Sequence, residues 1–432
     1  MPRRPIDIIL FVEHVARELD IACAVKHLVT KRHGLSLEIA SLAWDIGGTL
    51  AKYRPAVVTT PYCYTIGDFG THQIVPVWPD AYYVNLAYEQ VFQKINKAPK
   101  MPRDRFSRQC VLHHAWGEFF VGFLEQSGVR KENIVLNGNP TYALYRPPYR
   151  GYFESREELA ARFHLDPRKR WVFIPENYGV AFLNDRQMET RYGKFRDAQA
   201  DQFRDFAAAS FAQAARWWRK ACEMPGVELV LRPRPATPKD KIVEALCQDG
   251  STIPPRLHVI KEGTVREWIL AADLVASSYS TTLIESAVAS KPILMFIPIP
   301  FPDYVLADWY DLVPQAMTEA AFLDGVSNPD PGQTFRPLQA WAERTMLSRG
   351  DAIANIADLL ASVRKMERHV PGPPGIGILK TRLREPLPRK LRGICNRIYH
   401  AIVRRPGKSW ERDEITEADV ARRLARWAHV LG

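Results

Sequence analysis

Short apolar runs alternate with segments of helical periodicity along most of the chain, and this alternation restricts the possible folds more than any other feature. Residues 7–12 form an apolar run that predicts a strand, and residues 17–31 then carry apolar side chains on one helical face. The same order repeats up to about residue 297. Alternating strands and helices are typical of βαβ units, in which crossover helices join parallel strands. We therefore expect an α/β protein.

The alternation falls into two series. The first ends at a Gly/Pro-bearing turn at residues 137–140, and residues 145–170 then hold three prolines and a glycine around a short charged helical stretch. A chain of 432 residues is long enough for two or three domains. We expect an N-terminal domain over residues 1–150, a second domain over residues 168–363 and a basic helical tail over residues 364–432.

The positive charge of the chain is concentrated in that tail. The net charge is +11, and residues 364–412 alone hold 14 basic and 3 acidic residues. Residues 380–405 place apolar side chains at helical spacing among arginines and lysines, which predicts a basic amphipathic helix. We expect this helix to bind an anionic membrane surface, the alternative being that its apolar stripe packs on the body of the protein. No nucleic-acid partner is expected, because no nucleic-acid-binding module is recognisable.

The rest of the sequence favours a cytoplasmic protein, held peripherally on the inner face of the cytoplasmic membrane. The apolar run after the basic N-terminus stops at Glu13, unlike a signal peptide. The longest apolar stretch, residues 293–301, is far shorter than the ~20 residues of a membrane span. The six cysteines are scattered and lack zinc-site spacing, so we expect them to be reduced packing residues.

A hydroxyl-rich turn separates an expected strand at residues 274–276 from an expected helix at residues 282–289. The start of a helix offers free N–H groups to an anion, and hydroxyl groups can add donors to phosphate oxygens. The residues predicted here to bind a phosphate-bearing ligand are Ser278, Ser280, Thr281, Thr282 and Glu285, the last as a partner of ribose hydroxyls. The alternative is that Thr282 and Glu285 form only a capping box.

Two other loops follow expected strands at the end of a sheet where open α/β proteins bind ligands. Arg232 and Arg234 are each followed by a proline, and paired guanidinium groups suit phosphate oxygens. Asn177 and Tyr178 follow the first strand of the second series. We expect these four side chains to bind the same phosphate-bearing ligand as the hydroxyl-rich turn. A solvated arginine pair and an ordinary turn are the alternatives.

Carboxylate and imidazole groups follow two expected strands of the first domain. Both group types can deprotonate an acceptor hydroxyl. The candidate catalytic residues are Glu13, His14, His114 and Glu118. A second route is also open, in which the carboxylate of Glu13, Glu18 or Asp20 acts as a nucleophile and forms a covalent intermediate. Each histidine could instead be a hydrogen-bonded structural residue.

The second series, with Arg232-Pro-Arg234-Pro, the Glu262-Gly263 loop and the hydroxyl-rich turn, resembles B-type (GT-B) glycosyltransferases. In particular it resembles the bacterial proteins that build capsule and O-antigen. Matching motifs of the first series are Val12-Glu13-His14 with Arg17-Glu18-Leu19-Asp20, His113-His114-Ala115-Trp116-Gly117-Glu118, and Gly138-Asn139-Pro140, so that the resemblance covers roughly residues 5 to 320. It implies two Rossmann-like domains facing a cleft, with the donor held mainly by the second domain, Glu262 included, and the acceptor by the first. Related enzymes often carry a histidine where this chain has Arg234, and an arginine cannot act as an acid or base.

The expected activity is transfer of a sugar from a nucleotide-sugar donor, with a CMP-linked ulosonic acid such as Kdo as one option, to a lipid-linked or oligosaccharide acceptor in surface polysaccharide synthesis. No D-x-D triplet occurs, so we expect a metal-independent enzyme without a cofactor. A CDP-alcohol phosphotransferase of the teichoic-acid type is the alternative enzyme. A non-catalytic scaffold tethered by its basic helix is the third hypothesis.

Overall fold

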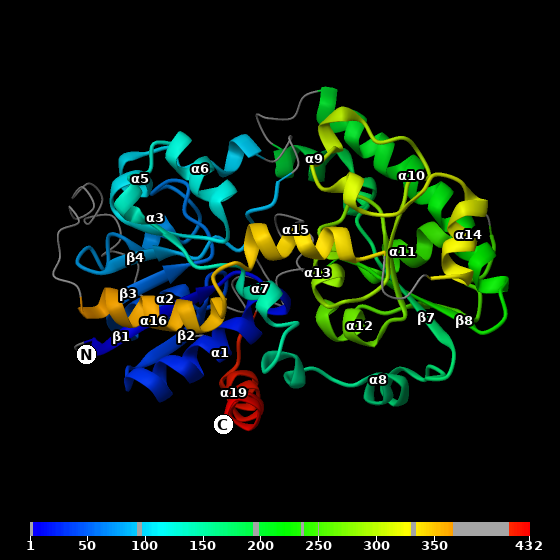
Figure 1. Cartoon of the computed structure of the whole chain (residues 1–432). Helices are drawn as coiled ribbons and strands as arrows, with labels where there is room; N and C mark the ends of the chain where they lie inside the picture. The colour runs from blue at the N-terminus through cyan, green and yellow to red at the C-terminus, as the bar shows by residue number, and fades with distance from the viewer. Residues whose placement is uncertain are drawn as a thin grey trace. The chain divides into compact units, whose positions relative to one another are not determined.

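The computed structural model describes residues 3–92, 97–192, 198–234, 237–248, 250–329, 334–365 and 414–432. The chain divides into two compact units (Figure 1). Unit 1 takes its described residues from 1–92, 96–152 and 344–432, and unit 2 takes them from 153–343.

Unit 1 is built on a six-stranded parallel sheet. Its strands are β1 (Arg4–Val12), β2 (Leu37–Ser41), β3 (Tyr53–Thr60), β4 (Tyr82–Asn85), β5 (Val111–Ala115) and β6 (Ile134–Leu136). Its helices are α1 (Val15–His33), α2 (Ile46–Lys52), α3 (Thr71–Ile74), α5 (Arg105–Gln109), α6 (Glu118–Gln126), α7 (Pro140–Ala143), α16 (Ala352–Lys365) and α19 (Glu417–Leu431). The strand order is β2-β1-β3-β4-β5-β6, a doubly wound order that reverses direction between β1 and β3.

The central strand β1 brings the first candidate residues to the edge of this sheet. Residues 8–12 are completely buried, as expected for an apolar strand covered on both faces. The helix α1 that follows ends where Gly34 adopts φ 66° and donates its N–H to the Thr30 carbonyl, a left-handed cap that favours glycine. Glu13 and His14 therefore lie at the carboxyl end of β1, between strand and helix.

Two helices from the end of the chain complete unit 1. Helix α16 packs on α1 and on β1, and α19 packs on α1 (Figure 1). Trp427 of α19 is buried, stacks on Tyr152 with ring centroids 4.0 Å apart, and donates its Nε1–H to the Asp20 carbonyl at 2.9 Å. The Arg423 Nε–H donates to Asp20 Oδ1 at 2.9 Å. Asp20 therefore anchors the C-terminal helix and is committed to that structural task.

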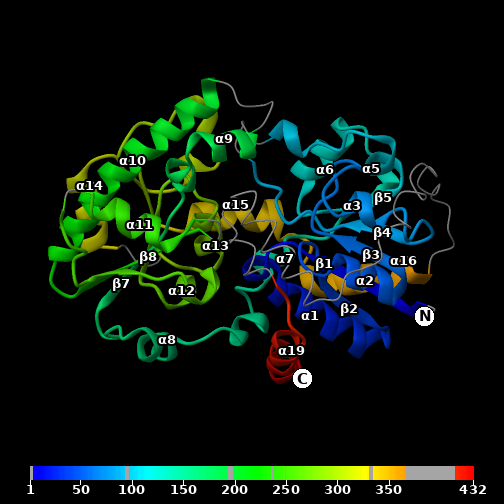
Figure 2. The ribbon, with the colours of Figure 1, turned by 180° about the vertical axis from the view of Figure 1, so that it is seen from behind.

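Unit 2 has a second parallel sheet of six strands (Figure 2). Its strands are β7 (Arg170–Pro175), β8 (Val227–Arg232), β9 (Leu257–Val259), β10 (Leu274–Ser277), β11 (Ile293–Phe296) and β12 (Gln315–Ala316). Its helices are α8 (Arg156–Phe163), α9 (Asp185–Tyr192), α10 (Ala198–Glu223), α11 (Lys239–Leu246), α12 (Val265–Ala271), α13 (Thr282–Val288), α14 (Glu319–Ser327) and most of α15 (Arg336–Met346). The strand order β12-β11-β10-β7-β8-β9 is the Rossmann order, which reverses between β7 and β10.

The expected α/β class with two Rossmann-like domains is confirmed, but the units are bounded differently from the expected domains. Residues 344–365 and 414–432 join unit 1, because apolar faces of α16 and α19 are buried on it. The expected second domain extended to residue 363, and the expected tail began at residue 364. The predicted basic helix at residues 380–405 lies outside the described residues.

Three smaller observations bear on the expectations from sequence. The five cysteines that the structure describes are free thiols, and four of them are buried. Within the described ranges, no helix is long and apolar enough to cross a bilayer. The same ranges contain no group of three or more His, Cys, Asp and Glu side chains arranged to hold a metal ion.

Candidate functional site

The loops after β7 and β10 lie on the two sides of the point where the strand order of unit 2 reverses. In open α/β sheets, ligands bind at this point, beyond the carboxyl ends of the strands. The Asn177 side chain joins the two loops, since its Nδ2–H donates to the Tyr279 carbonyl at 2.8 Å. Asn177 thus positions the hydroxyl-rich turn, a role that differs from the direct donor contact expected from sequence.

The hydroxyl groups of the turn differ in accessibility. Ser280 is half-buried, and its Oγ accepts the Thr282 N–H at 3.3 Å and lies 3.1 Å from Thr282 Oγ1. Thr281 is exposed. Ser278 is buried beside Tyr178, and the Tyr178 ring is 1% exposed and packs edge-on against Tyr279. Ser280, Thr281 and Thr282 therefore have the more accessible hydroxyls, whereas those of Ser278 and Tyr178 are buried, and the predicted donor contact of these two residues stays a prediction.

The helix that starts at this turn matches neither the anion-binding helix start nor the capping box expected from its sequence. Thr281 is the N-cap residue and makes no side-chain cap, so Thr282 and Glu285 do not form a capping box. Helix α13 has only seven residues, so its dipole is a minor contribution to anion binding. Glu285 is half-buried in its first turn. Recognition of an anion at this edge therefore depends on side chains.

Arg232 has a structural role. The side chain is 7% exposed, and its guanidinium donates to the carbonyls of Lys261, Glu262 and Gly263. The distance from Nη2 to the Gly263 oxygen is 2.8 Å. These bonds fix the loop after β9, since five N–H donors in a fixed fork can span several carbonyls. The geometry favours loop ordering over the phosphate contact expected for Arg232.

Glu262 takes part in that loop mainly through its backbone. Its carbonyl accepts bonds from Arg232 and from the Trp268 indole N–H at 3.1 Å. Its exposed carboxylate accepts the Lys261 N–H at 3.0 Å. The predicted donor contact of Glu262 stays a prediction.

Arg234 differs from Arg232 in every respect that matters for a ligand. It is exposed, and its guanidinium makes no hydrogen bond to any residue that the structure describes. Its backbone N–H donates to Glu176 Oε2 at 3.2 Å, which holds the residue beside the loop after β7. Its side chain also lies against Gly179, where an added Cβ would be 3.6 Å from Arg234 Cδ. Among the described residues of the loops after β7, β8 and β10, Arg234 is therefore an exposed cation that an anion at this edge could reach.

Glu176 is the buried acidic residue behind Arg234. Burial raises its pKa, and the Arg234 charge together with hydrogen bonds from neighbouring N–H and hydroxyl groups opposes that shift. The sequence placed Glu176 in a loop of interest but assigned it no role. A role for Glu176 could have been inferred from its position, because it directly follows the strand β7 and lies two residues before Tyr178.

Unit 1 carries a network of charged groups at the carboxyl end of β1. The buried carboxylate of Glu18 accepts from Arg17 Nη2 at 2.7 Å and from the Glu13 N–H at 2.8 Å. Arg17 also bonds to Glu13 Oε2 at 3.4 Å and to Glu89 Oε1 at 2.5 Å. The His14 ring lies 3.9 Å from Glu13 Oε1. Sequence reasoning placed Arg17 in a motif without a role of its own, and it missed Glu89, because Glu89 follows a different strand.

Burial has opposite outcomes for two carboxylates of this network. Burial raises the pKa of Glu13, and the charges of His14 and Arg17 do not offset it. Burial also acts on Glu89, but Arg17 and Lys100 outweigh it and hold the pKa of Glu89 far below its usual range. A carboxylate with a raised pKa takes up a proton more readily. Glu13 is therefore the better candidate for a general base.

The other two predicted catalytic residues do not join this network. His114 is completely buried, with Nδ1 3.2 Å from the Leu86 carbonyl, and burial lowers its pKa to about 4. Because the ring is buried, the geometry favours a structural role for His114, and its role as a base stays a prediction. The Glu118 side chain is 77% exposed and pairs with Arg349 at 3.4 Å. Two strands separate β1 from β5, so Glu118 lies on the order of 14 Å from Glu13.

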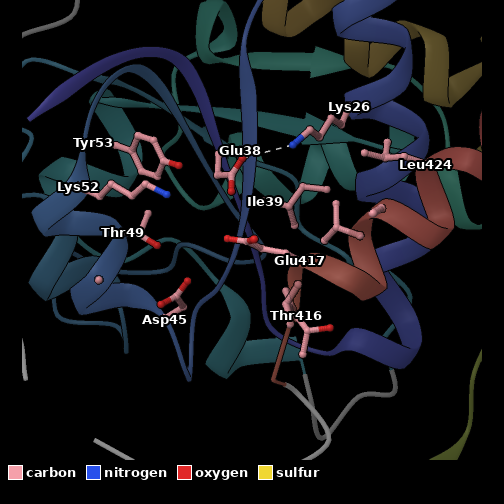
Figure 3. A pocket seen from close by; sticks show the side chains of 14 residues that line it. Lys26, Glu38, Ile39, Asp45, Thr49, Lys52, Tyr53, Thr416, Glu417 and Leu424 are labelled. Carbon is pink, nitrogen blue, oxygen red and sulfur yellow. Dashed lines mark hydrogen bonds and ion pairs between the residues drawn. The ribbon is translucent and has the colours of Figure 1, made fainter. Parts of the chain in front are cut away.

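A pocket of about 520 Å³ lies elsewhere in unit 1, beside the edge strand β2 and the start of α19 (Figure 3). Its charged lining includes Lys26 and Glu38, which pair at 3.3 Å, with Lys52 and the inward-directed carboxylate of Glu417. The hydrogen bond to Tyr53 and the charges of Glu38 and Glu417 raise the pKa of Lys52. The pocket borders the amino end of β3, so it is separate from the strand ends that carry the candidate residues.

The two parallel six-stranded sheets give the chain the two-domain α/β architecture of GT-B-like proteins. No protein-family model matches the sequence, and no curated protein matches it either. Solved structures do match. The wall teichoic acid polymerase TagF matches at TM-score 0.54 and 11% identity, covering 84% of this chain and 90% of that one.

Two other solved structures resemble the chain to a similar degree. The UDP-GlcNAc 2-epimerase from Neisseria meningitidis, bound to UDP-GlcNAc, matches at TM-score 0.53 and 10% identity over 83% of this chain and 100% of that one. The S. aureus MnaA–UDP structure matches at TM-score 0.51 and 12% identity over 81% and 94%. At such identities the likeness establishes the fold.

Proposed function

We propose that the protein is a glycosyltransferase that moves a sugar from a nucleotide-sugar donor to an oligosaccharide or lipid-linked acceptor in bacterial surface polysaccharide synthesis. The observation that carries the proposal is the exposed guanidinium of Arg234, which follows β8 and is held beside the loop after β7, on one side of the point where the Rossmann sheet reverses. The fold shared with structures that contain UDP or UDP-GlcNAc supports a nucleotide as the ligand of this edge.

In this proposal Arg234 neutralises the donor phosphate, and the hydroxyls of Ser280, Thr281 and Thr282 donate to its oxygens. A fixed positive charge next to the leaving phosphate stabilises the charge that develops as the glycosidic bond breaks. Arg232 and Asn177 support these groups by holding the two flanking loops. Glu285 remains the proposed partner of the ribose.

The number of available cations bears on the donor. Of the three cations at the ends of β8 and β9, Arg232 and Lys261 donate to carbonyls, whereas the Arg234 guanidinium does not bond to a described residue. One guanidinium fork matches one phosphate group. This favours a nucleoside monophosphate sugar, such as a CMP-linked ulosonic acid, as the first donor to test.

Unit 1 would supply the base. Glu13 takes the proton of the acceptor hydroxyl, and the freed electron pair forms the bond to the anomeric carbon. The bond from that carbon to the donor phosphate oxygen breaks, and the nucleotide leaves as its phosphate anion. Arg17 would position Glu13 through the network that also includes Glu18 and Glu89.

Calorimetry with UDP-, GDP-, CDP- and CMP-sugars tests the donor site. Arg234→Ala should weaken binding by about 10- to 100-fold, because it removes a charge-assisted bidentate bond. Arg168→Ala is the matched control, since Arg168 is 89% exposed in the same unit and pairs only with Asp166 on the surface. Unchanged affinity in a folded Arg234→Ala variant would contradict the proposal.

A CDP-alcohol phosphotransferase of the teichoic-acid type is the second candidate, because the fold is shared with the wall teichoic acid polymerase. The same donor screen separates the two. Transfer of label from a CDP-alcohol, with no transfer from any nucleotide sugar, would favour the phosphotransferase. The absence of both binding and transfer would favour the non-catalytic scaffold tethered to an anionic membrane through residues 380–405.

A further inference from the structure

The strand order of unit 1 also reverses, between β1 and β3, and the loops after these two strands carry different chemistry. The loop after β1 holds Glu13 and begins the helix that holds Arg17. The loop after β3 holds Tyr62 and Tyr64. Doubly wound sheets of this order bind their ligands at this reversal. Charged groups and aromatic rings are thus placed at one ligand-binding position.

The two tyrosines form a stacked pair. Their ring centroids are 5.7 Å apart and their planes differ by 16°. Both side chains are half-buried, so part of each ring faces solvent. Burial raises the pKa of both hydroxyls, and the charge of Glu13 adds to the shift in each case. Glu13 is therefore a close electrostatic neighbour of both rings.

The loop that carries the rings is held in place from several sides. Asp68 accepts the N–H groups of Tyr64 and Thr65, at 2.5 and 3.0 Å. Asp104 accepts the Ile66 N–H at 2.7 Å, and the Arg103 N–H donates to the Tyr64 carbonyl at 2.9 Å. A platform fixed before binding loses little conformational freedom when a ligand arrives.

The charges around the rings are mostly negative. The carboxylates that act on the two hydroxyls are those of Glu13, Glu18, Asp68 and Glu89. Arg17 and Lys100 offset them in part and are themselves paired with these carboxylates. The Arg103 side chain bonds to the Pro99 carbonyl. An anionic ligand would be repelled here, whereas a neutral or amino sugar would not.

We propose that Tyr62 and Tyr64 form an acceptor platform on which a neutral or amino pyranose stacks beside Glu13, and that the platform rejects acceptors ending in a uronic acid, a sialic acid or a phosphate. The inference rests on the proposed glycosyl transfer for the identity of its ligand. Aromatic faces next to hydrogen-bonding groups suit a sugar, which has an apolar C–H face and polar edges. The platform would thereby set acceptor specificity.

The test is a binding assay of the full-length protein on an array of neutral, amino, uronic-acid and sialic-acid glycans, together with glycerol phosphate oligomers. Tyr64→Ala and Tyr62→Ala should each weaken binding of neutral or amino glycans by about tenfold, as expected for loss of one aromatic stacking contact. Tyr64→Phe should keep most of the affinity. Tyr82→Ala, at the amino end of β4, is the matched control for loss of a tyrosine in the same unit.

A second arm tests the charge argument. Glu89→Gln removes one carboxylate at the rim and should improve binding of acidic glycans relative to neutral ones. Thermal unfolding of each variant verifies that it is folded. Donor affinity, measured by calorimetry, should stay unchanged in the Tyr62 and Tyr64 variants.

The outcomes separate this inference from the proposed function. Three outcomes would each overturn the platform. The protein could bind donor normally but bind no glycan, or it could bind acidic glycans most tightly. It could also bind neutral glycans with the same affinity in the unaltered protein and in both alanine variants. Glycan binding that depends on the tyrosines, with no affinity for any nucleotide sugar, would overturn the proposed transfer and leave the platform standing as a glycan-binding site.

Discussion

Acidification should destabilise unit 1 through two buried histidines. His113 Nε2 lies 2.6 Å from the Ser107 carbonyl, and His114 Nδ1 lies 3.2 Å from the Leu86 carbonyl. Burial lowers the pKa of each from 6.5 to about 4, although these bonds oppose the shift. Both rings are therefore neutral in the folded protein at physiological pH.

The sign of the effect follows from where each state binds protons. In the window between 6.5 and about 4, the unfolded chain binds more protons at these histidines than the folded chain does. Their contribution to stability is fully present above the window and is lost as the pH falls through it. The slope is about 1.4 kcal/mol per pH unit for each histidine, or about 3 kcal/mol each over the whole window.

Urea unfolding between about pH 7.5 and pH 4.5 measures this slope. His114→Gln and the double variant with His113→Gln lose hydrogen bonds, so their absolute stability falls, but their slope should be shallower than that of the unaltered protein. Carboxylates titrate in all three proteins and cancel in the comparison. Equal slopes would refute the reasoning, and so would an activity profile whose acidic limb disappears specifically in His114→Gln.

Three further predictions test individual contacts. Gly117→Ala should strongly destabilise unit 1 in thermal unfolding, because an added Cβ would lie 1.7 Å from the Thr345 carbonyl oxygen. Gly122→Ala should instead stabilise α6 by about 0.5–1 kcal/mol, because no atom lies within 4 Å of the added Cβ. Trp427→Ala should lower the free energy of unfolding by about 3–5 kcal/mol and increase hydrogen exchange in α19, while Trp427→Phe should retain most of the stacking on Tyr152. Equal hydrogen exchange in the unaltered protein and both variants would exclude a role of Trp427 in docking α19. Arg232→Lys should lower the free energy of unfolding by about 2–3 kcal/mol and raise hydrogen exchange in residues 261–263, because one ammonium cannot reach three carbonyls. A change in donor affinity without these two effects would argue for direct contact between Arg232 and the donor phosphate.

The sequence by itself determined the α/β class and most of the element bounds. Apolar runs, helical periodicity and caps such as Gly34 are local features, and they place β1, α1, β10 and α13 within a few residues of their observed ends. It also predicted that the two arginines after β8 lie at the carboxyl edge, because strand direction follows from chain order in a parallel sheet.

Only the tertiary structure decided what each side chain does there. Whether an arginine faces solvent or three carbonyls depends on a loop from another strand, which separates the roles of Arg232 and Arg234. Burial of His114 and docking of α19 on α1 likewise depend on surfaces far apart in the sequence. Local pattern fixes a residue's place on its own element, and long-range packing fixes its partners, its exposure and therefore its charge state.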